Sequence, residues 1–145
     1  FNLSHCRDRV LIGLTRRLPI GVDLERIRPL PNRYALATHC CSADELNWLA
    51  GRSASDQDRD FFRIWTAKEA VLKTLGTGLA RPPEPVTISL PNTDSGFARV
   101  TGAGSPWTLF STCPDADHAI AAGIRAVISR GPIRCFHLAG ERLDQ

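Results

Sequence analysis

Two acidic side chains stand inside an apolar run near the start of the chain. Asp23 and Glu25 belong to the segment GVDLE, in which Val22 and Leu24 alternate with them. This alternation predicts a strand, and side chains two apart on a strand point to the same face, about 7 Å apart along the chain. Like charges on one face repel each other, and burying either one without a partner is costly. The segment therefore needs a compensating positive charge.

A third acidic side chain lies on the strongest predicted helix, residues 57–75. Its apolar residues recur every three to four positions, and Gly76 suits the end of a helix. Trp65, Glu69 and Lys73 are each four residues apart, so they share one face. An exposed Glu69–Lys73 pair would be an ordinary salt bridge worth a few tenths of a kcal/mol. The large aromatic side chain on the same face favours a partly buried stripe instead.

Together these residues predict chemistry on phosphate groups. Asp23, Glu25 and Glu69 supply three carboxylates, the hard oxygen ligands that Mg²⁺ prefers. Lys68 and Lys73 lie beside Glu69 in sequence and suit binding of phosphate oxygens next to a cation. The pattern predicts metal-assisted reaction of a phosphate ester or anhydride. It leaves nuclease, phosphatase and transferase open.

The elements that must hold these side chains are short strands and helices in a mixed order. We predict helices at 34–39, 43–50 and 57–75, the second opened by a capping box of Ser42 and Glu45. The predicted strands are 1–4, 10–15, 19–25, 86–90, 97–101, 107–112, 119–126 and a short last one at 133–138. Links of hairpin length between most strands predict an α+β fold, with an antiparallel sheet packed against the long helix.

Composition limits the classes of protein. The chain has 145 residues, 43% hydrophobic and 23% charged, which is typical of one soluble globular domain. No apolar stretch reaches the roughly 18 residues of a membrane span, and no signal peptide opens the chain. The five cysteines lack metal-type spacing, so we expect reduced thiols in a cytoplasmic protein. The chain has no Met and starts at Phe1, from which we expect a fragment or a processed product.

Three motifs point to a known family. FNLSH, GVDLE and FFRIWTAKEAVLKTLGTGL occur here in the order and at the intervals found in 4′-phosphopantetheinyl transferases of the surfactin-synthetase-activating (Sfp) type. The chain resembles that family from Phe1 to about the 120s. The resemblance implies an enzyme that transfers the 4′-phosphopantetheine arm of coenzyme A to a serine of an apo acyl or peptidyl carrier protein. Such an enzyme needs Mg²⁺ and releases adenosine 3′,5′-bisphosphate.

The resemblance also implies roles for individual residues. It implies that Asp23, Glu25 and Glu69 are the metal ligands. Glu69, through a bound water, resembles the group that deprotonates the carrier serine, and Lys73 resembles a catalytic contact to the pyrophosphate. The further implied coenzyme contacts are Lys68, His5 and, as a weaker match, Ser4. Trp65 resembles a structural residue that lines the site.

Residues 27–41 match the segment that receives the carrier in the family. Carriers of this kind are acidic, so the arginines at 26, 28 and 33 suit electrostatic docking. A solvated basic surface is the alternative explanation of these arginines.

Members of the family consist of two similar halves with the active site between them, a pseudo-dimeric fold. FNLSH resembles the start of the second half, so we predict that residues 1–145 form one domain, the metal-binding half. The N-terminal half, or a second copy, would then be needed to complete the cleft. Two alternatives stay open: a non-catalytic fragment that binds metal or carrier, and a Mg²⁺-dependent nuclease or phosphatase. We expect no nucleic acid partner, because a nuclease should show a broad basic face.

Overall fold

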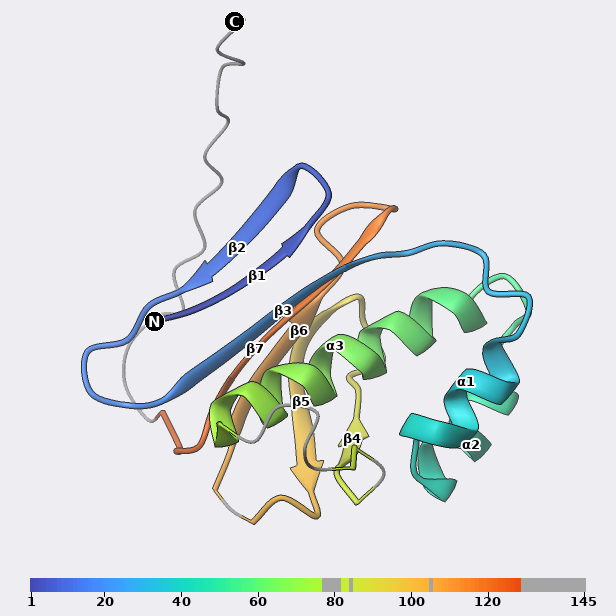
Figure 1. Ribbon diagram of the computed structural model, residues 1–145. Coiled ribbons are helices and arrows are strands. Elements are labelled where there is room, and N and C mark those ends of the chain that lie inside the picture. Colours follow the sequence, from blue (N-terminus) through green and yellow to red (C-terminus); the bar gives the residue numbers. More distant parts are fainter. Residues whose placement is uncertain (77–81, 84, 105, 129–145) are drawn as a thin grey trace, which may run out of the picture.

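A five-stranded antiparallel sheet with one long helix across it forms the body of the protein (Figure 1). The computed structural model describes residues 1–76, 82–83, 85–104 and 106–128. Across the sheet the strands are β3 (Ile20–Arg26), β7 (His118–Ile124), β6 (Thr108–Thr112), β5 (Ser95–Thr101) and β4 (Thr87–Ser89).

The long helix α3 (Gln57–Leu75) lies very close to strand β3. A Cβ atom added at Gly21 would stand 2.0 Å from the carbonyl oxygen of Ala70, so only glycine permits this approach. Because Gly21 faces α3, the alternation of the strand turns Asp23 and Glu25 toward α3 as well. Gly76 ends the helix with a φ of 71°, the left-handed conformation that glycine adopts without strain.

A separate two-stranded hairpin lies alongside β3. It consists of β1 (Asn2–Cys6) and β2 (Arg9–Gly13), which pair antiparallel (Figure 1). Side chains of β1 bind the backbone of β3: Asn2 Oδ1 accepts from the Val22 N–H at 2.9 Å, and Ser4 Oγ accepts from the Leu24 N–H at 3.2 Å. These side-chain bonds fix the position of the hairpin on β3, next to Asp23.

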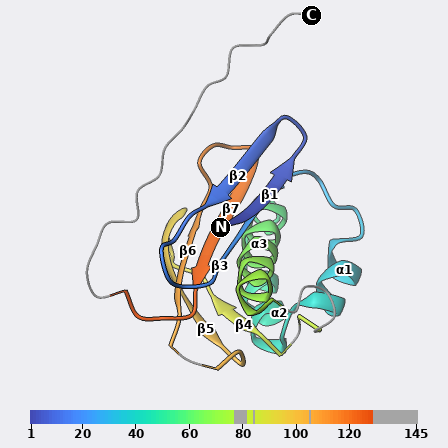
Figure 2. The ribbon, with the colours of Figure 1, turned by 60° about the vertical axis from the view of Figure 1, so that its left-hand side comes forward.

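Two short helices pack on the side of α3 that faces away from the sheet (Figure 2). They are α1 (Arg33–Cys40) and α2 (Ala43–Ala50). The capping box is present: Ser42 Oγ accepts from the Glu45 N–H, and the Glu45 carboxylate accepts from the Ser42 N–H at 2.7 Å. The apolar cluster between these helices and α3 includes Ala37, Cys40, Cys41, Leu49, Phe61, Phe62 and Ile64.

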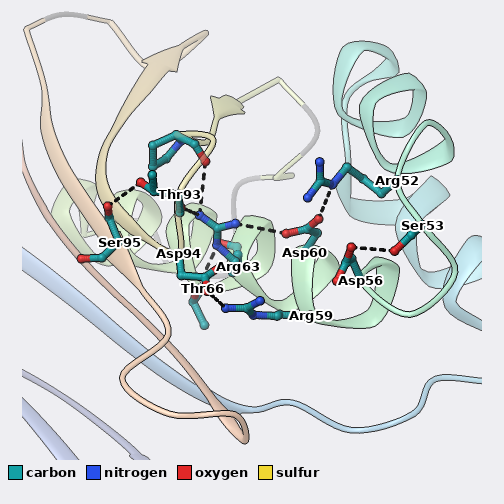
Figure 3. A network of polar contacts seen from close by, with 11 residues as sticks. Arg52, Ser53, Asp56, Arg59, Asp60, Arg63, Thr66, Thr93, Asp94 and Ser95 are labelled. Carbon is teal, nitrogen blue, oxygen red and sulfur yellow. Dashed lines mark hydrogen bonds and ion pairs between the residues drawn. The ribbon is translucent and has the colours of Figure 1, made fainter.

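A network of charged groups ties the first half of α3 to the turn between β4 and β5 (Figure 3). The buried Arg63 guanidinium pairs with Asp60 at 3.1 Å and donates to the carbonyl oxygen of Thr93 at 2.6 Å. Asp60 also accepts from Arg52 Nε at 2.6 Å. Because buried charges are stable only when paired, these contacts fix where the helix begins relative to the sheet.

The predicted α+β class with an antiparallel sheet is confirmed. The predicted bounds of α2 and α3 agree with the structure, and the helix expected at 34–39 is one residue longer at each end. Strand β4 is shorter than expected, and the strand expected at 133–138 lies outside the described residues. No helix in the described part of the chain is long and apolar enough to cross a membrane.

Candidate functional site

Asp23 lies where β1, β3 and α3 meet, with its side chain only 7% exposed. Its Oδ1 atom accepts from Lys73 Nζ at 2.7 Å and from Ser4 Oγ at 3.0 Å. Lys73 also donates to the carbonyl oxygen of Val22 at 3.1 Å. The other carboxylate oxygen, Oδ2, is buried and has no hydrogen-bond partner among the described residues. One oxygen is therefore held in place, and the other stays available.

Glu69 adds a second such oxygen from the helix. Its Oε1 atom is buried and lacks a hydrogen-bond partner in the described part of the chain. Burial and the charge of Asp23 raise the pKa of Glu69, the Lys73 ammonium lowers it, and Glu25 raises it slightly further. The three carboxylates thus lie close enough to repel one another.

Glu25 completes the acidic group at the end of β3. Burial and the charge of Asp23 raise the pKa of Glu25, while Arg28, a hydrogen bond from Trp65 and the charge of Lys73 lower it. The Arg28 guanidinium lies 3.8 Å from the Glu25 carboxylate. Trp65 therefore contributes its indole N–H to the site and not only its ring.

These groups suit a hard divalent cation with few protein ligands. Two buried carboxylate oxygens, from Asp23 and Glu69, lack hydrogen-bond partners among the residues that the structure describes. Mg²⁺ is commonly bound by one or two carboxylates plus waters and phosphates. The described residues nevertheless contain no group of three or more His, Cys, Asp or Glu side chains that are arranged to hold a metal ion. The carboxylates are neighbours, and Lys73 binds Asp23 Oδ1 beside them.

The two residues predicted from β1 point in opposite directions. Ser4 is buried and is engaged with Asp23 and with the Leu24 N–H, so it orients the carboxylate. His5 is exposed and lies opposite Val10 on the outer face of the hairpin. The structure therefore does not bring His5 to Asp23.

Lys68 is completely buried and bound within the fold. Its side chain has no exposed surface, and its Nζ atom binds Glu45 Oε2 at 2.7 Å, the carbonyl oxygen of Pro83 at 3.0 Å and that of Val86. An ammonium group has three N–H donors, and all three are used. The expected contact to coenzyme A is not supported, because no donor remains for it.

The arginines that follow β3 are also partly committed to the fold. Arg33 forms an ion pair with Asp58, and Arg28 stacks on the Phe62 ring with 4.9 Å to its centroid. Arg28 also lies 3.8 Å from the Glu25 carboxylate, so both Arg28 and Arg33 pair with carboxylates of the fold.

Sequence reasoning missed one polar cluster near this end of the sheet. Asp115 accepts from Arg9 Nη1 at 2.5 Å and lies 2.9 Å from His118 Nδ1. It joins the turn before β7 to the first hairpin. Because Arg9 and Asp115 are 106 positions apart, no local pattern signals the contact.

The sequence of this chain is similar to a known protein family and to several of its members. Residues 19–123 match the family model described as the 4′-phosphopantetheinyl transferase superfamily. The 4′-phosphopantetheinyl transferase HetI of Nostoc sp. is 34% identical over 122 residues, which are 84% of this chain and 49% of that protein. The 4′-phosphopantetheinyl transferase psf-1 of Bacillus pumilus is 30% identical over 138 residues, 95% of this chain and 56% of that protein. The chain spans about half the length of these curated relatives.

Two solved structures share the fold. A holo-(acyl-carrier-protein) synthase from Bacillus anthracis, in complex with CoA (3′,5′-ADP), superposes with a TM-score of 0.60 at 18% identity, covering 74% of this chain and 94% of that one. The holo-[acyl-carrier-protein] synthase of Thermotoga maritima gives 0.59 at 19% identity, covering 74% and 62%. At these identities the likeness shows the fold alone.

Proposed function

Because the chain belongs to the 4′-phosphopantetheinyl transferase superfamily, we propose that it is the metal-binding half of an Sfp-type enzyme. The reaction transfers the 4′-phosphopantetheine arm of coenzyme A to a serine of an apo acyl or peptidyl carrier protein. The observation that carries the proposal is the acidic group around Asp23. Two buried carboxylate oxygens that have no hydrogen-bond partner within the described ranges lie beside a lysine that can reach an anion.

Asp23 Oδ2 and Glu69 Oε1 would hold Mg²⁺, with Glu25 next to them. The cation, when bound, neutralises charge on the pyrophosphate of the coenzyme. Ser4 and Lys73 keep the Asp23 carboxylate oriented by binding its other oxygen. This arrangement explains why GVDLE places two carboxylates on one face of a strand.

Lys73 and Glu69 are the proposed catalytic residues. Asp23 and Val22 accept two of the three N–H donors of Lys73, so one remains for a phosphate oxygen on which charge develops. Glu69 takes the serine proton, directly or through a water. The serine oxygen bonds to the phosphorus of the phosphopantetheine group while the anhydride bond breaks, and adenosine 3′,5′-bisphosphate leaves.

The outer face of the first hairpin supports a two-part architecture. Leu3, Val10, Ile12 and Leu14 are all exposed there, and Leu3 lies directly opposite Ile12. A contiguous exposed apolar face of this kind marks an interface. We propose that the other half of the enzyme, or a second copy, covers it, and residues 1–145 then act as one domain of the pair. His5 lies on the same face, so it would contact the coenzyme only in the assembled cleft.

An acidic carrier protein would dock along residues 27–41. Tyr34 and Leu36 of α1 are exposed, and Arg28 is exposed beside them in sequence. This surface combines apolar anchors with positive charge, which suits an acidic helical partner. We place the reaction in the cytoplasm, and the free thiols of Cys6, Cys41 and Cys113 support a reducing compartment.

Mass spectrometry of an apo carrier protein tests the proposal. The chain is incubated with carrier, coenzyme A and Mg²⁺, alone and together with a half that covers the hairpin face. We expect phosphopantetheine on the carrier serine in the assembled form, and its loss with Asp23→Ala or Glu69→Ala while the fold survives. The exposed Asp44 on α2 gives a matched control, and Asp44→Ala should keep activity.

The same assay separates the alternatives. Carrier or metal binding without transfer in any assembly would favour the non-catalytic fragment. Hydrolysis of DNA or of a phosphomonoester, lost in Asp23→Ala, would favour the nuclease or phosphatase.

A further inference from the structure

Lysine is rare in this protein, and both copies lie on α3. Lys68 and Lys73 are the only lysines in the sequence, against sixteen arginines. Lys73 is 25% exposed and pairs with Asp23, whereas the side chain of Lys68 has no exposed surface. A compact ammonium with three tetrahedral donors differs from the planar fork of arginine. The Lys68 pocket offers three separate oxygen acceptors, from Glu45, Pro83 and Val86, which only the ammonium can satisfy together.

Glu45 is the partner that makes this pocket specific. Its carboxylate is 2% exposed and accepts three hydrogen bonds: from Lys68 Nζ at 2.7 Å, the Ser42 N–H at 2.7 Å and the Ile88 N–H at 2.6 Å. The carboxylate therefore joins the start of α2, the middle of α3 and strand β4. Lys68 adds two bonds to the segment that leads into β4. Every polar atom of the pair has a partner.

A buried ion pair of this kind contributes position more than stability. The desolvation of both charges offsets most of their attraction, so apolar side chains of similar volume would stabilise the fold about as well. The pair instead specifies one arrangement, because any rotation of α3 breaks three bonds at Lys68 together. Helix geometry places Glu69 about 100° around the axis from Lys68, and Lys73 about 140°. Fixing Lys68 on one side therefore fixes Glu69 and Lys73 on the side that faces Asp23.

We propose that Lys68 is a positioning residue that acts with Glu45 to set the rotation of α3, and that it makes no contact with the coenzyme. The part of this inference that concerns catalysis rests on the proposed function. The part that concerns the ion pair rests on the contacts of Lys68 and Glu45 alone. The inference reverses the role that the family resemblance implies for Lys68.

Amine labelling of the unmodified protein tests the burial directly. Acetic anhydride can label Lys68, Lys73 and the N-terminus, and peptide mass spectrometry reads each site. We expect Lys68 to stay unlabelled while the protein is folded, with or without coenzyme A. Lys73 should be labelled in the free protein and protected by coenzyme A with Mg²⁺. Labelling of Lys68 that coenzyme A suppresses would overturn the proposal, whereas an unprotected Lys73 would count against the proposed function only.

A double-mutant cycle tests the coupling of the two charges. Lys68→Met leaves the Glu45 carboxylate buried without its cation, and we expect the Tm to fall by about 10 °C. Lys68→Met combined with Glu45→Gln removes both charges and should recover at least half of that loss. A loss in the double variant equal to the sum of the losses in Lys68→Met and in Glu45→Gln alone would show that the pair is not coupled. If only the double variant folds, the two charges are coupled. If neither variant folds, the amine labelling of the unmodified protein tests the proposal.

The labelling rate of Lys73 distinguishes a positioning role of Lys68 from a purely structural one. In folded Lys68→Met, a rotated helix weakens the Lys73–Asp23 contact, so acetic anhydride should label Lys73 several-fold faster than in the unmodified protein. The double variant should return to the slower rate, and Lys68→Arg should not, because its planar group cannot bind the three acceptors. An unchanged rate at Lys73 in folded Lys68→Met would overturn the positioning role.

Discussion

Replacing Lys73 by methionine should destabilise the metal-free protein measurably. The ammonium donates to Asp23 Oδ1 at 2.7 Å and to the Val22 carbonyl oxygen at 3.1 Å, and Asp23 is almost fully buried. A hydrogen bond to a charged group contributes about 1.5–3 kcal/mol, and breaking a buried pair costs about 3–5 kcal/mol. Lys73 is one-quarter exposed, so water replaces part of its contribution. We therefore expect a loss of about 2 kcal/mol, or a Tm lower by about 4–8 °C.

Thermal melts of Lys73→Met, Asp23→Asn and their combination, all without metal, check this value. The combined variant should be more stable than Lys73→Met, because it no longer buries an unpaired carboxylate. Lys73→Arg keeps the charge and should lose less. In the complete enzyme, Lys73→Met should lower kcat by roughly 10²–10³. A Tm within about 1 °C of the unmodified protein would refute the buried pair, and an unchanged kcat would refute the catalytic role.

Two further outcomes follow from the charges around the site. Burial and neighbouring carboxylates raise the pKa of Glu25 and Glu69 above 4.5, so the folded state binds protons more tightly than the unfolded state. Without metal, the free energy of unfolding should increase as the pH falls toward about 4.5. Glu69→Gln should make this pH dependence weaker. A free energy of unfolding that increases with pH in this range would contradict the prediction. Reversing Arg26 to Glu should raise the KM for carrier far more than the KM for coenzyme A. Arg33→Glu should lower the Tm instead, because Arg33 pairs with Asp58.

Local signals in the sequence were sufficient to locate the helices and most strands, but not to order the strands in the sheet. The capping box of Ser42 and Glu45 marks the start of α2, and Gly76 marks the end of α3, so both helices have the predicted bounds. The strands were recognisable from alternating apolar residues and intervening turns. Their order in the sheet, with β3 paired to β7, joins residues about a hundred positions apart and has no local signal.

The relative positions of site residues were predictable within one helix or strand, but not between different helices and strands. Helical spacing placed Glu69 and Lys73 on one face, but the partner of Lys73 is Asp23 on a distant strand rather than Glu69. Lys68 adjoins Glu69 in sequence, yet the position of the helix turns it toward Glu45, 23 residues earlier. Sequence spacing identifies the side chains of one face, and only tertiary packing determines what that face meets.

The two ion pairs on α3 differ in charge balance, and this difference distinguishes the structural pair from the candidate functional site. Lys68 and Glu45 are one cation and one anion, both fully hydrogen-bonded and both buried. Around Asp23, by contrast, three carboxylates meet two cations of the described chain, Lys73 and Arg28, and two carboxylate oxygens have no hydrogen-bond partner there. A fold gains nothing from burying an unbalanced anionic group, because the uncompensated charge costs free energy. A further cation would balance this charge, so the imbalance is the strongest physical reason to seek Mg²⁺ at this end of α3.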